Sequence, residues 1–180
     1  VNDVDVYPNV EINDISTNSC AVKKGSLFFA IKGSNHDGHD YINDAIKNKV
    51  SAIIANKELK NLPVPFIKVK NTRRVLSKIA SRFYKNPSKK LKIIGVTGTN
   101  GKTTTSSLIK SIFDSAGIDA AQLGTIGLIS KYNFSNNSLT TPDPIYLNKL
   151  ISMLVEKKVS YLIMEVSSHS IDQHRVTDIE

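Results

Sequence analysis

A glycine-rich stretch near the middle of the chain indicates phosphate-binding chemistry: V-T-G-T-N-G-K-T-T-T at residues 96–105. Gly98 and Gly101 lack a Cβ, so the backbone can turn sharply and bring its N–H groups close to phosphate oxygens. Lys102 would reach the β- and γ-phosphates of a nucleoside triphosphate, and the Thr103 hydroxyl would hold Mg²⁺. The residues expected to complete this phosphate site are Thr99, Asn100 and Thr104.

The spacing is G-x-x-G-K-T, which is shorter than the general G-x-x-x-x-G-K-T pattern because Val96 stands where the first glycine would be. An ordinary glycine turn, capped by threonines before a helix, is the alternative interpretation. A tight turn alone does not explain why Gly-Lys-Thr lies at the helix start. The stretch is therefore interpreted as a phosphate-binding loop.

Carboxylate, imidazole and guanidinium groups gather near the end of the chain. Glu165 closes an otherwise apolar run, and ligands collect at the carboxyl ends of parallel strands. It could face the Mg²⁺ held by Thr103, since Mg²⁺ prefers hard oxygen ligands; the alternative is a solvent-exposed strand end. His169 could ligate a second divalent ion, hydrogen-bond a substrate, or be a merely polar loop residue. Arg175 suits a carboxylate or phosphate, with a plain surface position as the alternative.

Strands and helices are predicted to surround the glycine-rich loop. A mostly apolar run at residues 92–96 is typical of a parallel strand covered on both faces. Further strands are expected at residues 122–129, where glycines permit close backbone approach, and at residues 159–166, with residues 167–170 turning out of the last one. Two sets of apolar residues fall at helical spacing: Leu108, Ile109, Ile112, Phe113 and Ala116, then Leu147, Leu150, Ile151 and Leu154. Gly117 follows the first set, where a left-handed cap would end the helix. The loop therefore lies in a strand-to-helix turn.

The first half of the chain is predicted to form an α/β unit of its own. Strands are expected at residues 26–31, 51–55 and 66–69. Asp40 is expected to cap one helix and Asn71 a second, longer one. The apolar faces of these helices comprise Tyr41, Ile42, Ala45 and Ile46, then Val75, Leu76, Ile79, Ala80 and Phe83. Such alternation favours βαβ packing.

The expected fold class is α/β, in two domains. The boundary is placed in the polar stretch at residues 85–90, where Pro87 ends a helix. The small N-terminal α/β domain would span residues 1–88. An incomplete P-loop domain with a parallel sheet would span residues 89–180, since only three strands can be identified after Leu91.

Composition and charge narrow the classes of partner. The 24 Lys and Arg residues exceed the 16 Asp and Glu residues, which gives a net charge of +8. The lysines are scattered and no basic patch interleaved with aromatic residues is present, so no nucleic-acid partner is expected. No apolar run near 18 residues and no charged-then-apolar leader is present, so no membrane partner is expected. The single Cys20 fits a reducing compartment, and a cytoplasmic protein is expected.

Three motifs together resemble those of the Mur ligases of peptidoglycan synthesis. They are T-G-T-N-G-K-T-T at 97–104, T-T-P-D-P at 140–144 and M-E-V-S-S-H-S-I-D-Q-H-R-V at 164–176. The segment D-I-S-T-N-S-C-A-V-K-K-G-S-L-F-F-A-I-K-G at 14–33, followed by D-G-H-D-Y-I, is similar to the uridine-nucleotide-binding domain of the type that adds the third residue. That residue, usually a diamino acid, is joined to UDP-N-acetylmuramoyl-L-alanyl-D-glutamate. The resemblance covers nearly all of the chain.

The resemblance implies a reaction and a set of residue roles. The reaction would be ATP-dependent amide formation through an acyl phosphate, with ATP and Mg²⁺ as cofactors and a monomeric enzyme acting on small molecules. Catalysis would fall to Lys102, Glu165 and His169, and Mg²⁺ would be held by Thr103, Glu165 and His169. The UDP end of the substrate would contact Ser19, Ser34, Asn35 and His36, and its muramoyl-peptide end would contact Thr140, Thr141, Ser167, Gln173 and Arg175. A carbamylated lysine and a domain that selects the amino acid are implied beyond Glu180.

Three alternatives stay open at this point. Another Mur-type or a folylpolyglutamate-type ligase would share the phosphate loop, although the N-terminal pattern argues against the latter. The 180 residues could form a nucleotide-binding module without catalysis. A basic nucleic-acid-binding NTPase would show a steeply salt-dependent affinity for oligonucleotides.

Overall fold

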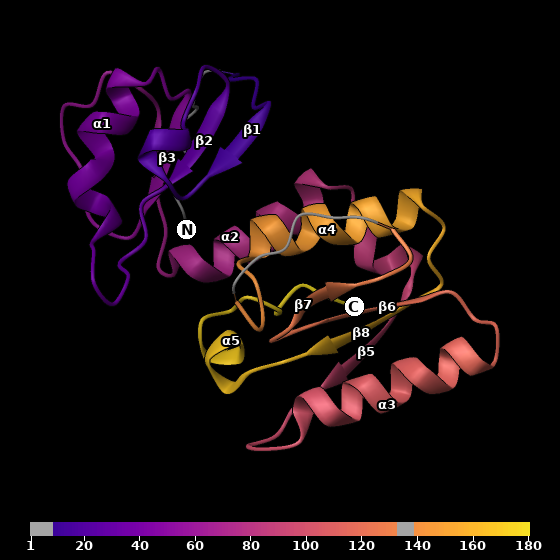
Figure 1. Cartoon of the computed structure of the whole chain (residues 1–180). Coiled ribbons are helices and arrows are strands. Elements are labelled where there is room, and N and C mark those ends of the chain that lie inside the picture. Colours follow the sequence, from indigo (N-terminus) through magenta and orange to yellow (C-terminus); the bar gives the residue numbers. More distant parts are fainter. Residues whose placement is uncertain (1–8, 133–138) are drawn as a thin grey trace. The chain divides into compact units, whose positions relative to one another are not determined.

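The computed structural model describes residues 9–132 and 139–180 and divides into two compact units, Val1–Val75 and Leu76–Glu180 (Figure 1). Each unit is built on its own sheet with helices packed against it, so the expected α/β class is confirmed. The dividing point falls within helix α2 (Thr72–Phe83). The domain boundary expected at residues 85–90 stays a prediction.

The first unit contains a four-stranded sheet in which all strands run parallel, in the order β1-β2-β3-β4. Its strands are β1 (Asp14–Ser16), β2 (Ser26–Phe29), β3 (Ala52–Ala55) and β4 (Phe66–Lys68). Helix α1 (Ile42–Lys47) contributes Ile42 and Ala45 to a core that also contains Phe28 and Ile53. The strands expected from the sequence are confirmed, each shorter by one or two residues.

Of the two helix-capping residues predicted in this unit, the structure confirms one and contradicts the other. The Asn71 side chain accepts a hydrogen bond from the Arg74 backbone N–H at 3.0 Å, which confirms the predicted cap of α2. The predicted cap at Asp40 is wrong. A 3-10 helix, η2 (Gly38–Tyr41), precedes α1, and Asp37 caps it by accepting from the His39 N–H. The extra turn moves the helix entrance three residues upstream.

The second unit contains a mixed sheet in the order β5-β8-β6-β7. Its strands are β5 (Lys92–Val96), β6 (Ala120–Gly124), β7 (Gly127–Ile129) and β8 (Tyr161–Glu165). Strands β5, β8 and β6 are parallel, whereas β6 and β7 form an antiparallel hairpin. The single strand expected at residues 122–129 is therefore wrong: the chain reverses at Thr125 and Ile126, and Gly127 follows at a φ of 88°, where an L side chain would be strained. The described sheet thus has four strands rather than the three expected.

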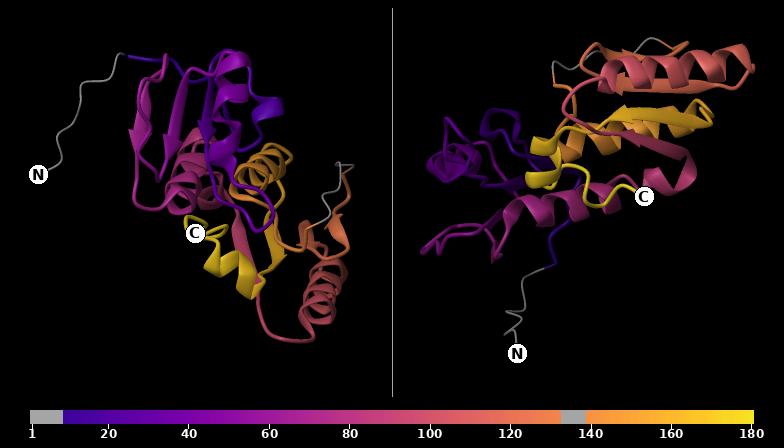
Figure 2. Two further views of the ribbon diagram at one scale, coloured as in Figure 1. Left: turned by 90° about the vertical axis from the view of Figure 1, so that its left-hand side faces the viewer. Right: turned by 90° about the horizontal axis from the view of Figure 1, so that it is seen from below.

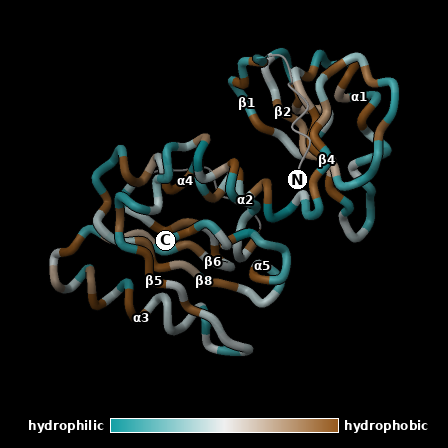
Figure 3. Tube along the Cα trace, turned by 180° about the vertical axis from the view of Figure 1, so that it is seen from behind, coloured by the Kyte–Doolittle hydropathy of each residue, from teal (hydrophilic) through white to brown (hydrophobic). Residues whose placement is uncertain are grey.

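Helices α3 (Lys102–Ser115) and α4 (Pro144–Glu156) lie on either side of these strands in Figure 1. The apolar face predicted for α4 is buried: Leu147, Leu150, Ile151 and Leu154 belong to the core of the unit. Residues of high hydropathy follow the strands of this sheet (Figure 3). None of the helices in the described part of the chain is both long and apolar enough to cross a membrane.

Two expectations about burial in the second unit are wrong. Strand β5 is only partly buried, because in the described chain it lies at the edge of the sheet with β8 as its one neighbour. The apolar residues of α3 are not all covered, and Leu108 and Ile112 are 61% and 69% exposed. The cap after α3 is confirmed, since Gly117 has a φ of 70° (Figure 2 gives two further views of α3).

Candidate active site

The glycine-rich loop joins the carboxyl end of β5 to the amino end of α3, as predicted, and residues 97–101 are exposed to solvent. Gly101 precedes the helix at a φ of 79° and gives it no side-chain cap, so the first N–H groups of α3 have no partner within the helix. A Cβ added to Gly101 would meet nothing within 4 Å. Glycine is needed here for the backbone conformation, while the space above the loop is open to an anion.

The Lys102 ammonium is folded back over this loop. Its Nζ donates hydrogen bonds to the carbonyl oxygens of Gly98 at 2.7 Å and Thr99 at 3.3 Å. The positive charge thus lies beside the unpaired N–H groups of α3, where the helix dipole also favours an anion.

Thr103 lies against Glu165, although the two residues are 62 positions apart. The Thr103 hydroxyl donates to Glu165 Oε2 at 3.0 Å. Strand register explains the meeting, since Val96 at the end of β5 pairs with Glu165 at the end of β8. Glu165 is fully buried, so a solvent-exposed strand end, the alternative interpretation of this residue, is wrong.

The β6–β7 turn holds the same carboxylate from another side. The Thr125 backbone N–H donates to Glu165 Oε1, and its hydroxyl donates to Oε2, both at 3.2 Å. A Cβ on Gly124 would lie 2.0 Å from Glu165 Oε1, so only glycine leaves room for the carboxylate. Sequence reasoning did not name Gly124 or Thr125 as site residues. The signal available was the glycine at the end of an apolar run, which did indicate a close approach.

The donor set at this point fits Mg²⁺. Thr103 and Glu165 present two oxygen atoms 3.0 Å apart next to the open loop, and Mg²⁺ usually takes one or two protein oxygens and completes its shell with water and phosphates. Among the described residues, no group of three or more His, Cys, Asp or Glu side chains is close enough together to hold a metal. The protein would therefore supply few ligands and leave most positions open.

His169 does not lie in the turn that the sequence predicts. It belongs to a short helix, α5 (Ser168–Asp172), which Ser167 caps by accepting from the Ser170 N–H at 3.2 Å. The His169 side chain is exposed, and the hydrogen bonds found among the described residues do not join it to Glu165. Its role as a metal ligand stays a prediction.

The T-T-P-D-P motif is connected to the carboxyl end of β8. The buried Thr141 hydroxyl donates to the Glu165 carbonyl oxygen at 2.8 Å and accepts from the Ser167 N–H at 3.2 Å. Thr140 Oγ1 lies 3.1 Å from Thr125 Oγ1. The motif is thus linked to Glu165 twice, through the Glu165 carbonyl oxygen and through Thr125, which itself contacts the carboxylate.

Arg175 ties the last loop to the same place. Its Nη1 donates to the Thr141 carbonyl oxygen at 2.7 Å, and its Nε and Nη2 donate to Gln173 Oε1 at 3.2 and 2.8 Å. Arg175 is half-buried and bonded to Thr141 and Gln173, so the plain surface position considered from the sequence is wrong. The structure therefore brings together all five residues predicted for the muramoyl-peptide end: Thr140, Thr141, Ser167, Gln173 and Arg175.

The residues predicted for the UDP end lie in the first unit, around a cavity of about 310 Å³. Ser19 and His36 line this cavity, whereas Ser34 and Asn35 are exposed and are not among its lining residues. Tyr41, which sequence reasoning did not assign to a site, also lines it. The Tyr41 hydroxyl lies 3.4 Å from His36 Nδ1, and the two rings meet edge to face. The cavity combines aromatic and polar walls, as nucleoside sites do.

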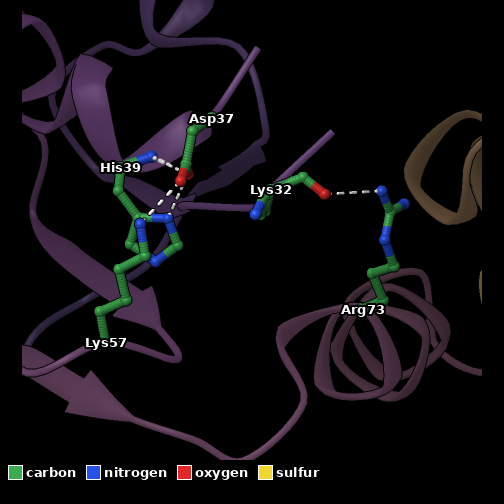
Figure 4. Close-up of polar contacts among 5 residues, drawn as sticks. All are labelled: Lys32, Asp37, His39, Lys57 and Arg73. Carbon is green, nitrogen blue, oxygen red and sulfur yellow. Dashed lines mark hydrogen bonds and ion pairs between the residues drawn. The ribbon is translucent and has the colours of Figure 1, made fainter. Parts of the chain in front are cut away.

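A partly exposed ion pair anchors the loop that carries His36. Asp37 accepts hydrogen bonds from Lys57 at 2.7 Å and from the His39 ring (Figure 4). The Lys57 ammonium, and after it His39, hold the pKa of the Asp37 carboxyl well below its usual value of 3.8. Gly38 lies beneath, and a Cβ there would be 2.6 Å from the Ile31 N–H nitrogen. The position of Asp37 and Gly38 is thus fixed by Lys57, by His39 and by the close packing of Gly38 on the Ile31 backbone.

Comparison with known protein families matches both units. The family model of the Mur ligase middle domain matches residues 96–180, and that of the Mur ligase family catalytic domain matches residues 11–84. The chain belongs to the Mur ligase family. The matched segments contain the glycine-rich loop, the Glu165 network and the cavity of the first unit.

Curated relatives extend this result. The chain is 42% identical over 175 residues to the "UDP-N-acetylmuramoyl-L-alanyl-D-glutamate--2,6-diaminopimelate ligase" of Clostridium tetani, covering 95% of this chain and 36% of the relative. It is 41% identical over 172 residues to the enzyme of that name, numbered 1, of Clostridium acetobutylicum, with the same coverage. A solved structure titled as this ligase is 27% identical, with a TM-score of 0.80 over 93% of this chain and 34% of that one. The chain therefore spans about a third of the length of these Mur ligases.

Proposed function

We propose that the complete protein is an ATP-dependent ligase that adds a diamino acid, as the third residue, to UDP-N-acetylmuramoyl-L-alanyl-D-glutamate. The relatives named above support the substrate and the reaction type. The observation that carries the proposal is the Thr103–Glu165 pair, 3.0 Å apart, beside an open phosphate loop. We further propose that it acts in the cytoplasm, as a monomer, on small molecules, and that residues 1–88 bind the UDP substrate while residues 89–180 bind ATP.

In this proposal the substrate carboxylate attacks the γ-phosphorus of ATP, which releases ADP and forms an acyl phosphate. The amine of the incoming amino acid then forms the amide bond and displaces inorganic phosphate. The chain need supply no nucleophile for either step. Its contribution is to position the reacting groups and to neutralise the charge that develops on the phosphates.

The phosphate loop would bind the terminal phosphates of ATP. The N–H groups at the start of α3 would donate to their oxygens, and Lys102 would exchange its contacts with Gly98 and Thr99 for the phosphates. The two carbonyl oxygens are contacted only by the terminal ammonium of Lys102, so rotation of this side chain is enough to move the ammonium to a phosphate. Thr99, Asn100 and Thr104 lie on the exposed rim of the same loop.

Thr103 and Glu165 would hold Mg²⁺, with His169 as a candidate for a second metal position. The ion would supply positive charge to the phosphate oxygens. Thr125 orients the Glu165 carboxylate through two hydrogen bonds, one from its backbone N–H and one from its hydroxyl. Thr140, Thr141, Ser167, Gln173 and Arg175 would orient the muramoyl-peptide end beside the phosphate that is transferred.

The test is the variant Lys102→Ala in the complete protein. Removing one preorganised donor of a transition state costs about 3 kcal/mol or more, or on the order of a hundredfold in turnover. ADP release is measured with UDP-muramoyl dipeptide, ATP and a diamino acid, and the amide product is identified by mass. Lys149→Ala, at an exposed position on α4, is the matched control. Turnover of Lys102→Ala near that of the control would refute the proposal. A product that carries an amino acid other than a diamino acid would assign the protein to another type of ligase.

A further inference from the structure

A second polar cavity, of about 250 Å³, lies in the first unit. Three basic residues line it, Lys32, Lys70 and Arg73, and among the described lining residues none is acidic. Lys32 and Lys70 are exposed, so their ammonium groups can turn toward a bound molecule. The charge of this cavity favours an anion.

The topology of the sheet explains why polar groups gather there. Lys32 follows β2, Asn56 follows β3, and Lys70 follows β4, so each comes from the carboxyl end of a parallel strand. Ligands of open parallel sheets bind at this edge. The cavity is thus placed where the fold presents side chains and backbone groups from consecutive strands.

Helix α2 begins at the same cavity. Asn71 and Thr72 line it, and α2 has twelve residues, long enough to present a positive dipole end. The Asn71 side chain satisfies the Arg74 N–H, while the N–H of Thr72 at the first helical position has no partner within the helix. Arg73 donates from Nη2 to the Lys32 carbonyl oxygen at 3.0 Å, which ties the helix start to the loop after β2 (Figure 4).

The Thr72 hydroxyl is an independent sign of a ligand. Thr72 is 5% exposed, and among the described residues its Oγ1 has no hydrogen-bond partner. A buried polar atom without a partner is costly, and proteins keep such groups mainly where a ligand, ion or water satisfies them. A phosphate oxygen in this cavity would accept from the hydroxyl while lying against the basic side chains.

We propose that this cavity is a phosphoryl-anion site, formed by the start of α2 with Thr72, Lys32, Lys70 and Arg73, none of which belongs to the glycine-rich loop at residues 96–105. Two sources of such an anion exist. Ile31 lines both this cavity and the 310 Å³ cavity, so the diphosphate of a uridine nucleotide could extend from one into the other. Free inorganic phosphate, the product of the proposed ligase, is the other source. The site itself does not rest on the proposed function.

The test uses backbone amide signals, because these locate binding at α2 even while the phosphate loop also binds phosphate. Potassium phosphate is titrated into the isotope-labelled complete protein, with potassium chloride at matched ionic strength as the reference. We expect saturable shifts of the Thr72 and Arg73 amides. Lys70→Gln and Thr72→Val are expected to weaken this binding roughly tenfold, the effect of one charge-assisted hydrogen bond. Lys78→Gln, an exposed charge on the same helix, is the matched control and leaves the affinity unchanged.

Titrations with UDP and with uridine separate the two sources. If the phosphate belongs to the nucleotide, Lys70→Gln weakens UDP binding and leaves uridine binding unchanged. If the site takes free phosphate, UDP affinity is unchanged and the phosphate shifts persist at saturating UDP. Thr72→Val removes only an unpartnered hydroxyl, so its melting temperature without phosphate stays equal or rises. Absence of saturable shifts at Thr72 and Arg73 with phosphate and with UDP, or an equal loss in Lys78→Gln, overturns the proposal.

Discussion

Replacing Gly124 by alanine is the sharpest perturbation that the structure offers, because one methyl group would strike the buried carboxylate of the site. The added Cβ would lie 2.0 Å from Glu165 Oε1 and 2.4 Å from its Cδ. Side-chain carbons essentially never approach other heavy atoms more closely than 3.0 Å, so Oε1 must move by about 1 Å. The Thr125 hydrogen bonds, already 3.2 Å long, would break.

The size of the effect follows from these contacts. A hydrogen bond to a charged group contributes about 1.5–3 kcal/mol, and a buried carboxylate that loses partners incurs a desolvation penalty of similar size. Crowding adds about 1–3 kcal/mol, whereas Gly→Ala in a strand by itself gains about 0.5–1 kcal/mol. We expect Gly124→Ala to lower the free energy of unfolding by about 3–5 kcal/mol, a large part of the stability of a small domain.

The assay is urea unfolding followed by far-UV circular dichroism, since the chain contains no tryptophan. Gly95→Ala is the matched control in the same sheet: its Cβ would lie 3.5 Å from Val166 Cγ2, an ordinary contact, and its stability should be unchanged or slightly higher. Adding Glu165→Asp to Gly124→Ala shortens the struck side chain and should restore part of the loss. If Gly124→Ala unfolds at the same urea concentration as Gly95→Ala, the packing around Glu165 is not as described.

Two further predictions concern the ion pair of the first unit and the core of the second. Lys57 and then His39 lower the pKa of Asp37 below 3.8, so the stability that they contribute is present above that pH and is lost as the pH falls further. In Asp37→Asn the melting temperature should therefore fall less steeply between pH 5 and pH 2 than in the unchanged protein. An equally steep fall in both would exclude these contacts of Asp37 as the source of the acid sensitivity. Ile151→Ala truncates a fully buried side chain and should lower the free energy of unfolding in urea by about 2–5 kcal/mol. Ile112→Ala, at a site 69% exposed, should lower it by about 0.5 kcal/mol or less. Equal losses in the two variants would contradict the assigned core.

Several parts of the fold could be predicted from the sequence because they depend on neighbouring residues. Capping of α2 by Asn71 and the turn at Gly117 each involve contacts or torsions within a few positions. The buried face of α4 follows from the spacing of its apolar residues, since a helix of period 3.6 must place them on one side. The local errors had local causes too: the 3-10 turn capped by Asp37 displaced the predicted cap at Asp40.

Residue types and their spacing were enough to locate the glycine-rich loop between a strand and a helix and the carboxylate at the end of a later strand. Loop torsions and helix starts are set by residues close together in the chain, and glycine, lysine and threonine carry that information directly. The contact between Thr103 and Glu165, the hydrogen bonds from Thr125 and the space that Gly124 leaves for this carboxylate became visible only in the folded chain. Those contacts depend on strand order and register, which join residues 40 or more positions apart, and such pairings are set by packing of the whole sheet.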